Sequence, residues 1–337
     1  MSTVPIMACH APRFVKSARK SLMRWAALYV TLALLPLVLL FVPPRLPGRS
    51  LFVEYGVGLG FVGLALLGLQ FVLTGRFHRV ASSLGLDTML QFHREAGIIA
   101  ALFVLGHVVV LLLYRPGYRV FLDPRVDAAR ALALWLVLIA LLLLIALTLL
   151  RRRLGLPYEW WRAAHAVFAS AVLLIGTVHV LRVGRYVSVP WRQTVWIAAV
   201  FVALGLLLHV RIIRPLQARR KPWRVVEIRR ERGSAWTLTL VPVGHGGLRF
   251  DAGQFVWLSF DPSALTLQQH PFSLSSSAER PEQIELTIKE LGDFTSRIGE
   301  VRPGRAAFLE GPYGAFTLPP DVTGAVFIPV AWESHLS

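Results

Sequence analysis

The sequence predicts an all-α membrane bundle of six helices followed by a small antiparallel β-barrel. Of its 337 residues, 55% are hydrophobic and only 16% are charged, whereas about a quarter are charged in soluble domains. Six apolar runs reach the length of about 20 helical residues that a bilayer requires. From about Pro222 the pattern changes to short alternating segments separated by Gly and Pro turns, which is typical of strands.

The six predicted spans follow one another through short loops. They cover residues 25–42, 51–73, 91–114, 131–150, 160–181 and 191–210. The first run follows a basic segment, as a secretory signal does. The segment PPRLPGRS follows it in place of a small-residue cleavage site, so we expect this run to be retained as a span.

Basic residues predict the orientation of the spans. The net charge is +17, but the arginines lie between apolar runs, which favours a membrane role over nucleic-acid binding. Sixteen Lys and Arg residues flank the spans on the side of the N-terminus, against nine on the other side. The positive-inside rule then places both termini in the cytoplasm of a multi-pass protein of the cell (plasma) membrane, with lipid around it. The one cysteine, Cys9, excludes an internal disulfide and a Cys-based cluster.

The second run contains GVGLGFVG, in which Gly58, Gly60 and Gly63 match a dinucleotide-binding spacing. That fingerprint requires a preceding strand and a soluble βαβ unit. Inside a membrane span, close helix–helix packing is the better interpretation.

Two runs each carry a pair of histidines with the same spacing. His93 and His107 lie in the third run, and His165 and His179 lie in the fifth. Fourteen residues make almost four helical turns, so each pair shares a face, about 21 Å apart along the axis. Because these two spans have the same direction, His93 and His165 are expected near the cytoplasmic face, and His107 and His179 near the outer face.

Facing imidazoles at two depths predict two bis-histidine haems of the b type, since ligation satisfies a ring that hydrocarbon would leave unpaired. The alternative is four polar residues that hydrogen-bond within the bundle or form a proton path. His209, His78 and His10 receive no role. Arginines near the inner and outer pairs could contact haem propionates or extend to the interface: Arg94, Arg162, Arg182 and Arg185.

Three motifs lie on the predicted barrel. They are AGQFVWL (252–258), HPFSLSS (270–276) and KELGDFTSRIG (289–299). A strand with small hydroxyls beside a ring can hydrogen-bond the edge of a flavin. In the third motif, Gly292 and Thr295 are expected to begin a helix, with Thr295 at or near its N-cap. The N–H groups at such a helix start suit a pyrophosphate.

Together, the two histidine pairs, GQF, HPFSLSS, LGDFT and GPYG (311–314) resemble the ferric reductase and NADPH oxidase superfamily over residues 26–318. The resemblance implies haem ligation by His93 with His165 and by His107 with His179. It also implies FAD binding at HPFS and GQF, with the pyrophosphate near Gly292 and Thr295. The implied FAD residues at the first two motifs are Gln254, Phe255, His270, Pro271, Phe272 and Ser273.

The resemblance further implies electron transfer from cytoplasmic NAD(P)H through FAD and two haems to an external ferric chelate or oxygen. Two other functions stay open. The chain could be a non-enzymatic cytochrome conduit reduced by a separate partner, or a histidine-lined proton or metal transporter without haem. A dithionite-reduced absorption spectrum separates these hypotheses.

Two features depart from the family pattern. Members with oxidase activity often carry a further His one turn beyond the outer ligand of the third span; here Leu111 stands there, which favours a metal reductase. After GPYG the family continues into a nicotinamide-binding α/β domain, but this chain reads GAVFIPVAWESHLS and ends at Ser337. We therefore expect a C-terminally truncated reductase with little NAD(P)H-dependent activity. The predicted segments are 1–24 (cytoplasmic), 25–214 (haem-binding), 222–320 (FAD-binding) and 321–337 (a stub).

Overall fold

The computed structural model describes residues 11–43, 47–75, 85–261, 268–314 and 317. The chain divides into two compact units, one made of residues 1–76 with 87–208 and the other of residues 77–86 with 209–337. Within the described residues, six helices are long and apolar enough to cross a membrane. The prediction of six spans is therefore confirmed, and the protein is a multi-pass membrane protein.

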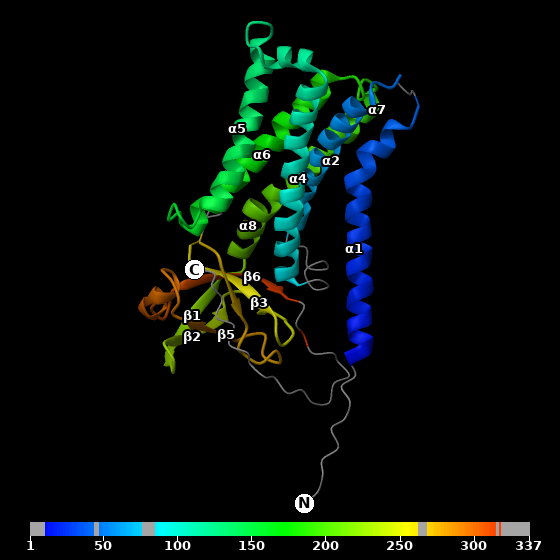
Figure 1. Ribbon diagram of the computed structural model, residues 1–337. Helices are drawn as coiled ribbons and strands as arrows, with labels where there is room; N and C mark the ends of the chain where they lie inside the picture. Colours follow the sequence, from blue (N-terminus) through cyan, green and yellow to red (C-terminus); the bar gives the residue numbers. More distant parts are fainter. Residues whose placement is uncertain (1–10, 44–46, 76–84, 262–267, 315–316, 318–337) are drawn as a thin grey trace, which may run out of the picture. The chain divides into compact units, whose positions relative to one another are not determined.

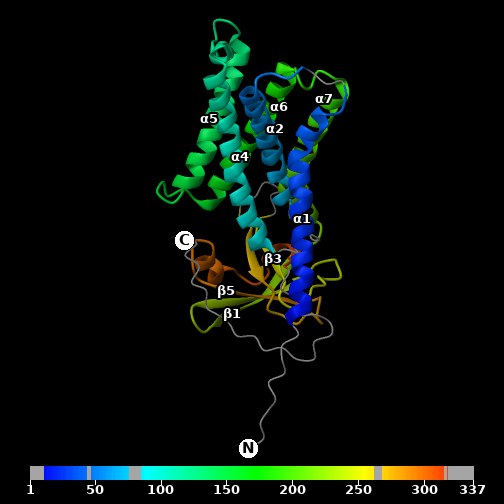
Figure 2. The ribbon, with the colours of Figure 1, turned by 45° about the vertical axis from the view of Figure 1, so that its right-hand side comes forward.

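The first unit is a helical bundle (Figures 1 and 2). Its long helices are α1 (Ala11–Leu40), α2 (Leu51–Leu73), α4 (Leu86–Tyr114), α5 (Ala128–Leu150), α6 (Tyr158–Val183) and α7 (Pro190–Leu208). A 3-10 turn, η1 (Pro116–Leu122), lies between α4 and α5. Asp127 caps α5 by accepting the backbone N–H of Arg130. Gly184, with a φ of 66°, ends α6 in the left-handed conformation that glycine adopts without strain.

Glycines allow α2 to approach α4 closely. A Cβ added at Gly63 would lie 2.9 Å from Val104 Cγ2, and one at Gly56 would lie 3.0 Å from Leu111 Cδ2. Gly56, Gly60 and Gly63 share one face of α2, as the helical period requires. The predicted packing role is confirmed for Gly60 and Gly63; Gly58 points instead toward Leu37 of α1.

The second unit begins with a π-helical turn, η2 (His209–Ile213), and the short helix α8 (Arg214–Arg219). An antiparallel sheet follows. Its strands are β1 (Trp223–Glu231), β2 (Ala235–Pro242), β3 (Phe255–Ser259), β4 (His270–Ser273), β5 (Ile284–Lys289) and β6 (Ala306–Tyr313). A 3-10 helix, η3 (Thr295–Glu300), precedes β6.

The sheet is open, which corrects the prediction of a closed barrel. Its strand order is β4-β3-β6-β1-β2-β5, so β4 and β5 are its edges. The edge strand β4 has four residues and contains Pro271, which has no N–H to donate and is suited to an edge. Just beyond it, the N–H of Ser275 donates to the carbonyl of Glu285 in β5 at 2.9 Å. The edges meet there without forming a ladder.

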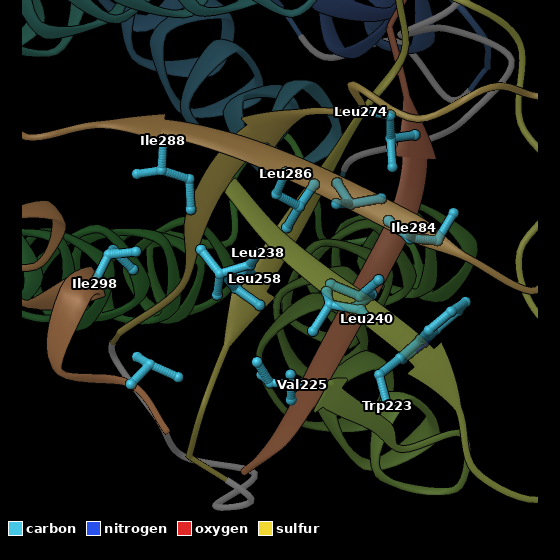
Figure 3. Close-up of a cluster of buried hydrophobic side chains, with 14 of the residues drawn as sticks. Trp223, Val225, Leu238, Leu240, Leu258, Leu274, Ile284, Leu286, Ile288 and Ile298 are labelled. Atoms are coloured by element: carbon cyan, nitrogen blue, oxygen red, sulfur yellow. The ribbon is translucent and has the colours of Figure 1, made fainter. Parts of the chain in front are cut away.

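One face of the sheet carries the core of this unit (Figure 3). The predicted inward face of β5 is confirmed, because Ile284, Leu286 and Ile288 are all at most 1% exposed. They pack with Leu238 and Leu240 of β2, which are fully buried. Alternation along each strand places these side chains on the same side.

The predicted segment boundaries near residues 214 and 222 stay predictions. The structure divides the chain between Leu208 and His209. Residues 1–10 and 318–337, which include the predicted stub at 321–337, lie outside the described residues.

Candidate functional site

The four predicted histidines form two facing pairs between α4 and α6. The ring centroids of His93 and His165 are 6.1 Å apart, with an interplanar angle of 56°. Those of His107 and His179 are 6.4 Å apart, with an angle of 72°. The matched spacing in sequence becomes matched pairing in space because α4 and α6 have the same direction and the same register.

These distances fit two imidazoles on opposite sides of one metal ion. A ligating imidazole nitrogen lies about 2.0–2.1 Å from a first-row metal and about 1.1 Å from its ring centroid, so trans centroids are about 6.4 Å apart. Within the described residues, no three His, Cys, Asp or Glu side chains converge as the donors of a bare metal ion would. A haem needs only two protein ligands, because its macrocycle supplies four nitrogens.

Backbone and side-chain oxygens hold two of the rings. Nδ1 of His107 lies 2.8 Å from the carbonyl oxygen of Gly56, and Nδ1 of His165 lies 3.4 Å from Oγ1 of Thr148. When Nδ1–H donates to such an oxygen, Nε2 keeps its lone pair for a metal.

Gln70 lies beside His93 inside the membrane-spanning region. One terminal atom of its amide is 2.6 Å from Nδ1 of His93 and 3.1 Å from the carbonyl oxygen of the same residue. The amide also hydrogen-bonds the hydroxyl of Tyr29 in α1 at 3.2 Å. Gln70 is only 7% exposed, so three helices contribute to the surroundings of this histidine.

Gly60 of α2 leaves room for the imidazole ring of His107. A Cβ at this position would lie 2.6 Å from Nδ1 of His107 and 2.9 Å from its Cε1. Real Cβ atoms essentially never come so close, so this face of α2 must lack a side chain where the imidazole passes.

The arginines near the histidines have different surroundings. Arg162 is buried, and its guanidinium lies over the ring of Tyr158. Arg185 donates to the carbonyl of Pro47 at 2.8 Å. Arg94 and Arg182 are exposed. His209 begins η2, whereas His10 and His78 lie outside the described residues.

The strand β4 carries the HPFS motif at the sheet edge. It pairs with β3 from Phe255 opposite Ser273 to Leu258 opposite His270. His270 and Phe272 are half-buried, whereas Pro271 and Ser273 are exposed. Ser273 therefore presents its hydroxyl at an open edge, as a strand that hydrogen-bonds a flavin should.

An aromatic group not predicted from the sequence joins this edge to η3. The Phe294 ring stacks on His270 at 3.9 Å between centroids and lies 6.1 Å from Phe272. Phe294 belongs to the LGDFT motif. The stacking brings that motif to the HPFS strand, so the two motifs that were predicted to bind FAD lie together.

The residues before β3 and η3 differ in part from expectation. Gln254 is buried, and its Oε1 accepts the N–H of Asp251 at 2.8 Å, so that oxygen orders the turn before β3. Its neighbour Phe255 packs against Tyr313 with centroids 5.9 Å apart.

Thr295 lies next to the N-cap of η3, in agreement with the prediction that it is at or near the cap, and Phe294 occupies the cap position itself. Thr295 Oγ1 accepts the N–H groups of Leu291 and Gly292, both at 2.9 Å. The predicted helix is a six-residue 3-10 turn. Its preceding loop is folded back on the threonine because that hydroxyl can satisfy two backbone donors together.

Sequence reasoning missed Gln70, Gly60 and Phe294. A glutamine within an apolar span is a signal in itself, since hydrocarbon offers an amide no partner. The glycine was recognised for packing, but its histidine neighbour is visible only in three dimensions.

Comparison with known proteins supports both units. Residues 59–176 match the family model of the ferric reductase like transmembrane component, and residues 238–317 match that of an FAD-binding domain. A probable dihydroorotate dehydrogenase B (NAD(+)) electron transfer subunit of Methanopyrus kandleri is 33% identical over 110 residues. That match covers 33% of this chain and 38% of the relative.

Solved structures are matched more weakly. A cytochrome P450 reductase of Amycolatopsis is 23% identical, covers 30% of each chain and has a TM-score of 0.26. A flavohemoglobin of Malassezia yamatoensis with bound FAD and haem is 16% identical. It covers 80% of this chain and 63% of that chain, with a TM-score of 0.30. Scores this low carry no argument about the fold.

The first family model matches the part of the helical unit that contains His93, His107 and His165, and the second matches the part of the sheet unit that contains HPFS and LGDFT. They occur in the order that the sequence motifs imply. The chain therefore has the architecture of the ferric reductase and NADPH oxidase superfamily, a ferric-reductase-like transmembrane component followed by an FAD-binding domain.

Proposed function

We propose that the protein is an oxidoreductase that passes electrons from reduced flavin at the cytoplasmic face through two b-type haems to an acceptor outside. His93 with His165 would hold the inner haem, and His107 with His179 the outer one. The acceptor is a ferric chelate or oxygen, and Leu111 in place of a further histidine favours the ferric chelate. The electron donor is NAD(P)H or a separate reductase partner.

The observation that carries this proposal is the equal geometry of the two histidine pairs. Centroid distances of 6.1 and 6.4 Å both match the span of a metal ion between two imidazoles. Fourteen residues place the pairs about 21 Å apart along the helices. Two haems at these depths would divide electron transfer across the bilayer into shorter steps.

Each cofactor supplies its own chemistry when bound, since FAD accepts a hydride and releases single electrons and haem carries one electron. The residues of this chain orient, separate and enclose them. His270, Phe272 and Ser273 of β4 would line the flavin together with Phe255, whereas Gln254 orders the adjoining turn. Pro271 terminates pairing at that edge, and the loop around Gly292 and Thr295 would face the pyrophosphate.

Gln70 would position His93. One end of its amide lies 2.6 Å from Nδ1 of His93 and 3.1 Å from the carbonyl oxygen of the same residue, and the other end lies 3.2 Å from both the N–H of Gly97 and the hydroxyl of Tyr29. The orientation that satisfies all four contacts turns the amide nitrogen toward His93 and lets the amide oxygen accept from Gly97 and Tyr29. Gln70 is thus a positioning residue for the inner site.

The absorption spectrum of the purified, haem-replete protein tests the proposal. Dithionite should produce sharp b-type bands with two haems per chain, and bound flavin should colour the oxidised protein yellow. Haem bands without flavin would favour a cytochrome conduit. A folded protein that binds no haem would exclude both and favour a proton or metal path through the histidines.

A further inference from the structure

The helical unit contains a cavity of about 610 Å³ between α1 and α2, with Phe103 of α4 also in its lining. Leu34 and Leu37 of α1 and Gly58 and Val62 of α2 line it. Its wall is almost wholly apolar. Leu34 is 42% exposed and lies in a predicted span, so the cavity opens toward hydrocarbon.

The sequence explains why the cavity exists. Pro36 lies within α1 beside the cavity and cannot donate a helical hydrogen bond. Gly58 offers no side chain to fill the gap, and a Cβ there would meet only Leu37 Cδ2, at 3.8 Å. Side chains therefore leave part of the space between α1 and α2 unfilled at this level. A cavity of this volume can hold a small organic ligand.

One end of the cavity carries a hydrogen-bonded polar pair. The hydroxyl of Tyr186 lies 2.5 Å from both carboxylate oxygens of Glu54, and the N–H of Arg49 donates to Glu54 Oε1 at 2.9 Å. Burial, followed by the bond to Glu54, raises the pKa of the Tyr186 phenol above its ordinary value. The phenol therefore keeps its proton, and its oxygen forms a polar end to an otherwise apolar cavity.

The cavity adjoins the outer histidine pair through α2 and α4. Phe103 lines the cavity one helical turn before His107. Leu59 also lines it, and Leu59 Cδ1 lies 3.3 Å from the Cβ position of Gly106, the residue before His107. The cavity therefore lies next to the helical turn of α4 that carries His107.

We propose that this cavity binds the head group of a lipophilic quinone, as a further electron acceptor. This inference rests on the proposed function. The apolar wall suits the ring, the opening suits its isoprenoid tail, and Tyr186 with Glu54 suits a quinone oxygen. A lipid acyl chain would match the apolar wall but would use neither of the polar groups, Tyr186 and Glu54, that line the cavity.

The reaction balances with the groups named. Conversion of a quinone to its quinol takes up two electrons and two protons. The electrons are those that the proposed function delivers singly to the outer side. The two protons come from water, which reaches this end of the cavity beside the exposed Ser50, and the Tyr186 hydroxyl can relay them.

The test measures binding separately from electron transfer. The full chain in lipid nanodiscs is labelled with an azido derivative of a short-chain ubiquinone, and the labelled peptides are mapped by mass spectrometry. Gly58→Leu fills the cavity, and Gly205→Leu is the matched control, because Gly205 lies in α7 with nothing within 4 Å of its Cβ position. Tyr186→Phe removes the donor.

We expect labelling on α1 and α2, reduced by about tenfold or more in Gly58→Leu through steric exclusion, and unchanged in Gly205→Leu. Haem bands should persist in both variants. The inference would be overturned if Gly58→Leu did not reduce the labelling. It would also be overturned if phospholipid stayed bound in the cavity in the presence of excess quinone. If the cavity is labelled specifically but the protein shows no haem bands, the proposed function is contradicted while quinone binding stands. Failure of the inference and failure of the proposed function therefore give different results.

Discussion

At the scale of single residues, the clearance around His107 decides whether the outer site can form. Gly60→Ala would place a methyl group 2.6 Å from Nδ1 of His107, so the ring must rotate or α2 must move. We expect the outer haem to be lost or to bind much more weakly, with the inner haem retained. Haem content per chain measures this. Gly58→Ala, whose Cβ would lie 3.8 Å from Leu37, is the control and should keep both haems.

Gln70 should tune the inner site without affecting the outer one. Its amide contacts both Nδ1 and the carbonyl oxygen of His93, and a leucine side chain offers neither contact. Gln70→Leu should therefore shift the inner midpoint potential by up to about 60 mV, the equivalent of one hydrogen bond of about 1.4 kcal/mol. Redox titration of both haems checks this, with the outer haem as internal reference. An unchanged inner potential would contradict the positioning role of Gln70.

The sequence predicted the four histidines and their pairing because helical periodicity and span direction suffice for that. It did not predict Gln70 beside His93, because the contact joins α2 to α4 and depends on their rotation about their axes. The role of Phe294 was missed for a similar reason. Its ring reaches His270 only because η3 folds back toward the sheet edge.

At the scale of elements, the core of the sheet unit depends on the inner face of β2. Leu238 is fully buried between β1 and β5. Leu238→Ala should lower the free energy of unfolding of this unit by about 2–5 kcal/mol, because it leaves a cavity. Denaturant unfolding followed by flavin fluorescence measures the change. Val226→Ala, at a 43% exposed position of β1, should change stability by less than about 0.5 kcal/mol.

The contact of Tyr186 with α2 should depend on pH. Burial and then Glu54 raise the pKa of the Tyr186 phenol, so the folded state holds this proton more tightly than the unfolded chain. The stabilisation is complete below the unfolded pKa of about 10 and is lost as pH rises through the folded value. An ultraviolet titration of wild type minus Tyr186→Phe should show one tyrosine that ionises above about pH 10. Ionisation at or below that value would contradict the contact.

Element types were predictable, but closure of the sheet was not. Alternating residues give strands and their buried faces, as Ile284, Leu286 and Ile288 show. Whether β4 pairs with β5 depends on strand lengths and on Pro271. The edges are joined through Ser275, whose N–H donates to the carbonyl of Glu285 and whose hydroxyl accepts from Thr287 at 3.1 Å. The helix expected at Thr295 is likewise a 3-10 turn because its hydroxyl bonds backward to Leu291 and Gly292.

At the scale of the whole molecule, the account requires two distinct metal centres in one helical unit. The pairs use different residues of the same two helices, so each should form without the other. Three of the four histidines, His93, His107 and His165, lie within residues 59–176, which match the ferric reductase like transmembrane component. His179 lies three residues beyond that match.

Haem stoichiometry in single-histidine variants is the most direct measurement of this claim. Wild type should contain two b-type haems per chain, and His107→Ala should contain one, with the spectrum and potential of the inner haem unchanged. His93→Ala should retain the outer haem instead. If His107→Ala keeps two haems with unaltered spectra, or if the folded wild-type protein takes up none, the histidine pairs are not haem ligands and the electron-transfer account is wrong.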